Sequence, residues 1–174
     1  INAVVMEGKN IDDIMPLIEL SKNYPVDIRF IEEMPFNGEG NHYPTLNWTY
    51  KKILHYIEGH YPTLTKIPDA PFSTSYNYRV PGYTGNIGVI AAFSRTFCGT
   101  CNRIRITAQG LLKTCLYDDG VLDIRQLLRS GAADEEIRYH LLKAFNSRAK
   151  DGIEAESRRR NHLPVSESMS TIGG

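Results

Sequence analysis

The first third of the chain carries hydrophobic positions at two different periods. Residues 1–6 are mostly apolar and predict a short buried strand. Residues 11–18 carry isoleucine and methionine at helical spacing, with Asn10 as the predicted helix cap, and residues 26–34 predict a second strand. Strand, helix and strand within 34 residues make a βαβ unit, so we expect the two strands to be parallel neighbours.

The middle of the chain predicts one helix and then several short strands. Residues 46–58 show the helical period, with Thr45 as a predicted cap and Gly59 as a predicted end. The chain is rich in proline and tyrosine from residue 60 onward. Short apolar runs separated by glycine predict strands at residues 76–80, 86–94, 103–108 and 111–116. We expect these strands to form an antiparallel sheet or meander.

The last third predicts two helices followed by a tail. Helical patterns cover residues 123–129 and 134–147. Residues 150–174 are polar with weak periodicity and predict an extended tail. The pattern as a whole predicts an α/β protein in which a βα part precedes an α+β part with antiparallel strands.

Composition and charge narrow the possible functions. Twenty basic residues balance twenty acidic ones, so any affinity for polyanions must come from a local cluster. We find no apolar run long enough to span a membrane and no signal peptide, so we expect no membrane contact and a cytoplasmic location. The chain begins INAVVM, inside a predicted strand, and we therefore expect it to be a piece of a longer protein.

The three cysteines, Cys98, Cys101 and Cys115, have metal-binding spacing. The Cys-x2-Cys pair places two thiolates on one tight turn, and a β-hairpin would return Cys115 beside them. This grouping favours a reducing compartment over a disulfide framework. Two kinds of centre fit: a zinc ion completed by a histidine, or a four-iron cluster with three thiolates and one open iron. The candidate histidines are His42, His55, His60, His140 and His162.

Two arginines follow the second cysteine. Arg103 and Arg105 alternate with Ile104 and Ile106, so a strand would place both guanidinium groups on one face. Two adjacent guanidinium groups suit a polyphosphate ligand. A strand with one solvated face is the alternative interpretation, and proximity to the cysteines favours the binding site.

Three stretches together resemble the C-terminal half of one enzyme family. The block FCGTCNRIRITAQGLLKTCL, the upstream IRFIEEMP and the terminal IGG follow the order found in the GTP 3′,8-cyclases (MoaA), radical S-adenosylmethionine enzymes of molybdenum cofactor biosynthesis. The resemblance covers essentially the whole chain and is most specific in the cysteine block. It implies the last part of an incomplete (βα)6 TIM-type barrel in residues 1–60. An α+β domain with antiparallel strands would then occupy residues 61–174.

The resemblance also implies roles for individual residues. Cys98, Cys101 and Cys115 would bind a 4Fe-4S cluster whose free iron contacts the guanine of GTP. The family's GTP-binding stretch falls on Arg103, Ile104 and Arg105, and its S-adenosylmethionine site includes Met34.

Further family positions lie near the same cavity. They fall on Arg29 and Asn2, and we expect Arg29 to act in catalysis. The tail that inserts toward the active site matches Gly173 and Gly174, which carry no side chain to obstruct entry. The sequence departs from the family at Glu33, where an apolar or aromatic residue is expected. It also departs in the stretch RRRNHLPV, which precedes SMSTIGG.

The family's second 4Fe-4S cluster cleaves S-adenosylmethionine and lies in a part absent from this sequence. We therefore expect the full-length protein to be the lyase and this chain alone to be inactive. The expected partners are GTP, the downstream cyclic pyranopterin monophosphate synthase and a second copy of the chain, without nucleic acid. The alternative function is a structural zinc-binding nucleic-acid module that uses Arg103, Arg105 and the basic run 158–160.

Overall fold

The computed structural model describes residues 1–34, 46–159 and 168–172. These residues form two compact units, the first from residues 1–34 and 46–97 and the second from residues 98–159 and 168–172. The boundary between the two units lies between residues 97 and 98, whereas the sequence analysis expected a functional division after residue 60. That functional division stays a prediction.

The first unit is built on a five-stranded mixed sheet in the order β1-β2-β5-β4-β3. Its strands are β1 (Asn2–Val5), β2 (Ile28–Glu32), β3 (Thr65–Lys66), β4 (Ser75–Arg79) and β5 (Ile87–Ile90). β1 and β2 are parallel neighbours, which confirms the predicted βαβ unit. β5 pairs parallel with β2 and antiparallel with β4, so β4 and β5 extend this sheet and do not start a separate one.

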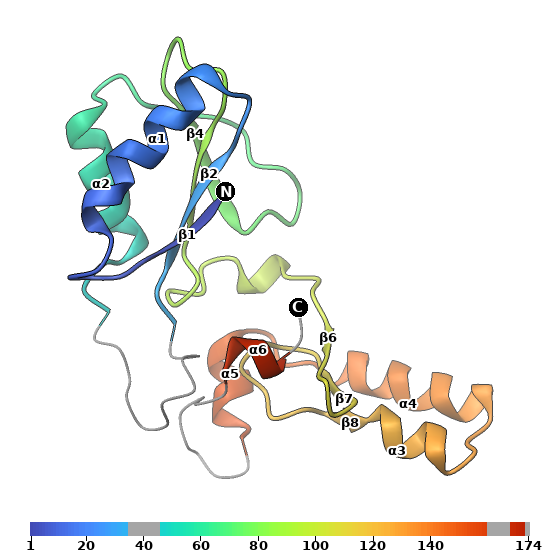
Figure 1. Ribbon diagram of the computed structural model, residues 1–174. Coiled ribbons are helices and arrows are strands. Elements are labelled where there is room, and N and C mark those ends of the chain that lie inside the picture. The colour runs from blue at the N-terminus through green and yellow to red at the C-terminus, as the bar shows by residue number, and fades with distance from the viewer. Residues whose placement is uncertain (35–45, 160–167, 173–174) are drawn as a thin grey trace. The chain divides into compact units, whose positions relative to one another are not determined.

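Two helices cover one face of this sheet (Figure 1). They are α1 (Ile14–Asn23), which follows a 3₁₀ turn at Ile11–Asp13, and α2 (Tyr50–His60). The apolar stripes of the helices meet the strands in one core, where Ile18 and Ile57 pack with Phe30 and Val89.

The helix termini differ from the sequence prediction. Asn10 stands at the N-cap of the 3₁₀ turn but makes no side-chain capping hydrogen bond: its side chain accepts from the N–H of Met6 at 2.9 Å and donates to the carbonyl of Val4 at 2.8 Å, closing the turn after β1. Helix α2 begins after Thr49, whose hydroxyl accepts from Lys52 N–H at 3.3 Å, and it continues through Gly59. The predicted cap Thr45 lies outside the described residues.

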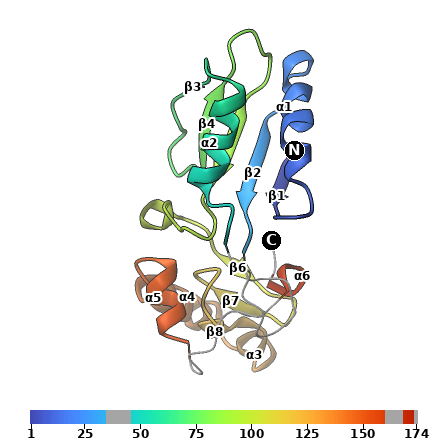
Figure 2. The same ribbon diagram turned by 90° about the vertical axis from the view of Figure 1, so that its left-hand side faces the viewer.

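The second unit contains a three-stranded antiparallel sheet in the order β6-β7-β8 (Figure 2). Its strands are β6 (Arg105–Ile106), β7 (Leu111–Lys113) and β8 (Leu122–Asp123). Helices α3 (Ile124–Arg129) and α4 (Asp134–Asn146) pack side by side and confirm the two predicted helices (Figure 1).

The predicted extended tail is wrong where the structure describes it. Residues Gly152–Ser157 form α5 and Met169–Ile172 form α6. The α5 helix starts at an N-cap, because Asp151 accepts from the N–H groups of Ile153 and Glu154 at 3.0 and 2.8 Å. A cap and six following residues were sufficient to form a short helix that the weak periodicity did not indicate.

The fold is therefore α/β, with one mixed and one antiparallel sheet. None of the described helices has both the length and the apolar character needed to cross a membrane.

Candidate functional site

The Cys-x2-Cys pair lies on a short 3₁₀ turn at Cys98–Thr100, at the start of the second unit. The N–H of Cys101 donates to the carbonyl of Cys98 at 3.2 Å, which closes the turn. All three cysteines are free thiols and are partly buried. The predicted tight turn therefore holds two thiols on neighbouring positions of one backbone loop.

A β-hairpin returns the third cysteine, as the spacing predicted. β6 and β7 pair antiparallel, with Arg105 opposite Lys113, and Cys115 follows β7 two residues later. Cys98 and Cys115 are close enough for their charges to interact. The three thiols therefore belong to one neighbourhood of the second unit.

The loop that carries Cys115 is folded around a buried carboxylate. Asp118 accepts from the backbone N–H groups of Thr114, Cys115 and Gly120 at 2.9, 2.8 and 2.9 Å, and from the Thr114 hydroxyl at 3.1 Å. Its side chain is only 8% exposed. One carboxylate thus fixes the backbone on both sides of Cys115.

N–H groups point at two of the sulfur atoms. Burial raises the pKa of Cys101, but a hydrogen bond from the backbone N–H of Arg103 and one from the Arg148 side chain outweigh it, so the net pKa is lowered. Burial raises the pKa of Cys115, and the nearby Asp118 and Cys98 raise it further. The backbone N–H of Tyr117 and the charge of Arg148 lower it, but they offset the increase only in part.

The grouping of possible ligands bears on which inorganic centre the thiols could hold. Within residues 1–34, 46–159 and 168–172, no three His, Cys, Asp or Glu side chains are grouped closely enough to hold one metal ion. Two of the candidate zinc ligands, His42 and His162, lie outside these ranges. A four-iron cluster is wider than one ion, so its thiolates stand further apart, and they commonly accept N–H hydrogen bonds. Three partly buried thiols, two of whose sulfurs accept N–H hydrogen bonds, have the chemistry of ligands for such a cluster.

The two predicted phosphate-binding arginines differ in their local structure. Strand β6 contains Arg105 but begins after Arg103, so the alternation argument applies to only one of them. Ile104 and Ile106 are 50% and 56% exposed, whereas Arg105 is partly buried. Both arginines lie within four residues of Cys101 along the chain.

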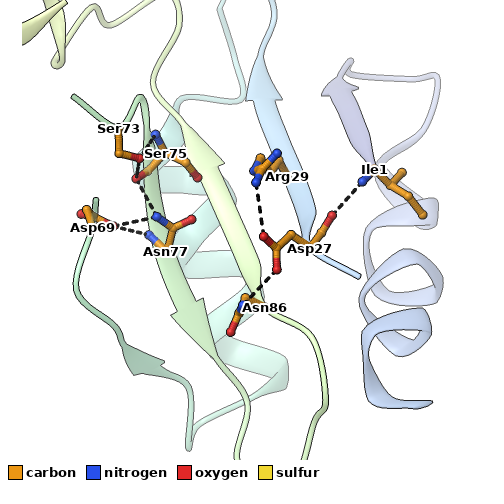
Figure 3. A network of polar contacts seen from close by, with 8 residues as sticks. All are labelled: Ile1, Asp27, Arg29, Asp69, Ser73, Ser75, Asn77 and Asn86. Atoms are coloured by element: carbon orange, nitrogen blue, oxygen red, sulfur yellow. Dashed lines mark hydrogen bonds and ion pairs between the residues drawn. The ribbon is translucent and has the colours of Figure 1, made fainter. Parts of the chain in front are cut away.

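Arg29 and Met34 belong to the first unit. Arg29 is on β2 opposite Asn2 of β1, and its guanidinium pairs with the Asp27 carboxylate at 3.2 Å (Figure 3). The other Asp27 oxygen accepts from the Asn86 amide at 2.9 Å. Met34 follows the end of β2 and is partly buried. Gly173 and Gly174 lie outside the described residues.

Comparison with known proteins identifies the family. Residues 26–153 match the family Molybdenum Cofactor Synthesis C. The chain belongs to this family.

Three named relatives match between 79% and 100% of this Molybdenum Cofactor Synthesis C chain. The mouse molybdenum cofactor biosynthesis protein 1 is 42% identical over 143 residues, 79% of this chain and 21% of that protein. The mitochondrial GTP 3′,8-cyclase of Arabidopsis thaliana is 35% identical over 144 residues, 79% of this chain and 35% of the relative. The GTP 3′,8-cyclase of Chlorobaculum tepidum is 30% identical over 174 residues, 100% of this chain and 51% of the relative. The chain thus spans from about a fifth to about half of these relatives.

Three residues of this Molybdenum Cofactor Synthesis C chain escaped the sequence prediction. Asp118 and Arg148 contact the cysteine segments, and Glu32, inside the quoted IRFIEEMP stretch, is fully buried. The aspartate followed by a glycine two residues later is a local turn signal that indicates Asp118. Arg148 has no such signal, because its proximity to Cys101 arises only when α4 packs against the sheet.

Proposed function

We propose that this chain is the C-terminal, GTP-binding part of a GTP 3′,8-cyclase. The whole enzyme would use S-adenosylmethionine to convert GTP to (8S)-3′,8-cyclo-7,8-dihydroguanosine 5′-triphosphate in molybdenum cofactor biosynthesis. Membership of the Molybdenum Cofactor Synthesis C family and the names of two relatives support this proposal. The observation that carries it is the β6–β7 hairpin of the second unit, which contains Arg105 and leads from the Cys98–Cys101 turn to Cys115.

In the second unit, Cys98, Cys101 and Cys115 would hold a 4Fe-4S cluster. When bound, that cluster supplies one coordination position free of protein ligands, at which a purine can be fixed. Arg103 and Arg105 would bind the triphosphate through paired N–H donors, and Ile104 would lie along the nucleotide. Because the base and the phosphates are held at separate points, the ribose between them would be oriented for hydrogen abstraction.

In the first unit, the parallel strands and their helices would be the last part of an incomplete barrel. Its functional boundary would fall near residue 60, and the sheet would contribute Arg29 and Met34 to the cavity that binds S-adenosylmethionine. The second cluster and the remaining strands would come from the part of the enzyme outside this chain. The product would pass to a cyclic pyranopterin monophosphate synthase. Cytoplasmic location stays a prediction, and one relative is named mitochondrial.

The test is binding of GTP to the chain after anaerobic reconstitution with iron and sulfide. We expect the parent to hold the cluster and to bind GTP in a calorimetric titration, and Cys115→Ser to lose both. The double variant Arg103→Gln/Arg105→Gln should keep iron and sulfide but bind GTP at least tenfold more weakly. The control Arg129→Gln, an exposed arginine at the end of α3, should match the parent.

Two results would contradict the proposal. GTP binding that does not depend on Cys115 would remove the role of the cluster. One zinc per chain without iron, together with salt-sensitive binding of duplex DNA, would favour the zinc-binding nucleic-acid module.

A further inference from the structure

The basic run at residues 158–160 begins where α5 ends, and the structure describes its first two members. Arg158 pairs with Glu154, inside the same helix, at 2.7 Å. Arg159 pairs with Asp119, in the loop between β7 and β8, also at 2.7 Å. Both arginines therefore make ion pairs within the chain, but only the second ion pair joins α5 to another segment.

Arg159 contacts the β7–β8 loop, which carries Cys115, at two points. Its Nη2 lies 2.7 Å from Oδ1 of Asp119, and its Nη1 donates to the carbonyl of Tyr117, 42 residues earlier in the chain, at 3.4 Å. Only 10% of the Arg159 side chain is exposed, compared with 52% for Arg158. A largely buried guanidinium with two acceptors restrains its partners more than an exposed ion pair does.

These contacts complete the restraint that Asp118 places on the same loop. The Asp118 carboxylate accepts from three backbone N–H groups of the loop, that of Cys115 included. Arg159 adds contacts at Tyr117 and Asp119, which flank Asp118 in the sequence. The conformation of the loop is thus fixed by a carboxylate of its own and by a guanidinium that comes from the end of α5.

The guanidinium can restrain the loop because α5 is itself anchored. Asp151 caps the start of the helix, and Arg158 donates to the carbonyl of Ser147, just beyond α4, at 2.9 Å. A cavity of about 120 Å³ is lined by residues of both the loop and α5. Because packing between the two segments is incomplete, the polar contacts of Arg159 contribute more to holding them together.

We propose that Arg159 is a positioning residue of the three-cysteine site, which holds the β7–β8 loop and so fixes the place of Cys115. This inference rests on the proposed function, because the centre that Cys115 would serve is the 4Fe-4S cluster. A loop that opens would move one of the three thiols away from the other two, so a bound cluster would be lost more readily. The basic run thereby has a role inside the chain that requires no nucleic acid.

Alkylation of the reduced chain, before any cluster is added, tests whether Arg159 holds the loop. Iodoacetamide is added, and the rate at each cysteine is read by peptide mass spectrometry. In Arg159→Gln we expect Cys115 to react about tenfold faster, a change that loss of one charge-assisted hydrogen bond can produce, while Cys98 and Cys101 keep their rates. Loss of a positive charge by itself would slow the reaction, since it disfavours the reactive thiolate. A faster reaction therefore reports opening of the loop.

Matched variants separate the loop contact from the loss of charge. Asp119→Asn should act like Arg159→Gln, and it provides the same measurement if Arg159→Gln does not fold. The double variant should be no faster than either single variant, because both changes break one contact. Arg159→Lys, which keeps the charge but has a single nitrogen, should lie between the parent and Arg159→Gln. The control Arg129→Gln, at the end of α3, should match the parent.

The reconstituted chain then links the loop to the inorganic centre. We expect iron to pass to a chelator about tenfold faster from Arg159→Gln than from the parent, as is typical when a group that supports a metal ligand is removed. Unchanged iron transfer would overturn the inference. Equal acceleration of alkylation at all three cysteines would also overturn it, because that pattern reports general loosening of the fold.

Failure of this inference is distinguishable from failure of the proposed function. If the parent assembles no iron–sulfur cluster, the proposed function fails, and the alkylation rates still decide whether Arg159 fixes the loop. If the parent assembles a cluster but Cys115 reacts at the parent's rate in Arg159→Gln, this inference alone is wrong.

Discussion

The carboxylate of Glu32 accepts hydrogen bonds from both the backbone N–H and the hydroxyl of Ser94, 62 residues further along the chain, each at 2.7 Å. It also accepts from the N–H of Tyr50, in the first turn of α2, at 2.6 Å. The Glu32 side chain is fully buried. A buried carboxylate at the positive end of a helix thus joins the end of β2, the start of α2 and the segment after β5.

Replacing Glu32 with alanine should lower the free energy of unfolding by on the order of 3 kcal/mol, because it leaves buried donors without a partner. Urea unfolding followed by circular dichroism measures this. The control Glu58→Ala, on the exposed side of α2, should change stability by no more than about 0.5 kcal/mol. A loss for Glu32→Ala as small as the control's would show that the buried hydrogen bonds contribute little.

Gly88 makes room for its neighbours on the sheet. A Cβ at this position would lie 2.3 Å from the Ser75 hydroxyl and 3.0 Å from Cγ of Arg29. Gly88→Ala should therefore lower the unfolding free energy by about 2 kcal/mol. Gly59→Ala has nothing within 4 Å and lies in a helix, so it should raise that energy by up to about 1 kcal/mol.

A second-site change tests the cause of the Gly88 effect. The Ser75 hydroxyl is buried without a hydrogen-bond partner among the described residues, so Ser75→Ala alone should be nearly neutral. Added to Gly88→Ala, it should recover much of the lost stability in the same urea titration. Additive losses in the double variant would mean that the 2.3 Å contact is not what destabilises Gly88→Ala.

Asp118→Asn should loosen the loop that carries Cys115. An amide offers only one oxygen to a set of donors that now share two, so we expect a loss of about 2 kcal/mol and faster release of iron after reconstitution. The matched control is Asp123→Asn at the N-cap of α3, where Asp and Asn cap equally well. Unfolding titrations and chelator assays give both numbers. Equal rates of iron release by the two variants would show that Asp118 does not stabilise the thiol site.

The pKa of Tyr61 is raised above its usual value, chiefly by burial and then by its hydrogen bond to Glu19. The folded chain therefore keeps the Tyr61 proton at a pH where the unfolded chain loses it, and stability should fall as pH rises above about 10. Tyr61→Phe should show a smaller decline between pH 8 and pH 11 in urea titrations. Tyr24→Phe, 59% exposed, should leave the decline unchanged. Identical slopes for the parent and Tyr61→Phe would contradict the assignment.

Local patterns predicted the parts of the fold that local geometry sets. The helical period between residues 11 and 18 and the apolar runs on either side gave the parallel pair β1 and β2. The spacing of the cysteines predicted the hairpin that returns Cys115, because a tight turn and antiparallel strands follow from a few adjacent residues. Helix ends were less predictable, because the Asn10 side chain hydrogen-bonds the backbone of Val4 and Met6 and not a helix N–H.

The sequence by itself therefore determined most of the helices and strands up to α4, though not α5 and α6, and which three thiols have the spacing of a metal centre. Tertiary structure decided that β4 and β5 join β2, that Glu32 meets Ser94, and that Arg148 reaches Cys101. The physical reason is the separation along the chain over which each effect acts. Hydrophobic periodicity depends on side chains that are close in the sequence. Pairings between distant segments depend on the free energy of packing and hydrogen bonding across the whole unit.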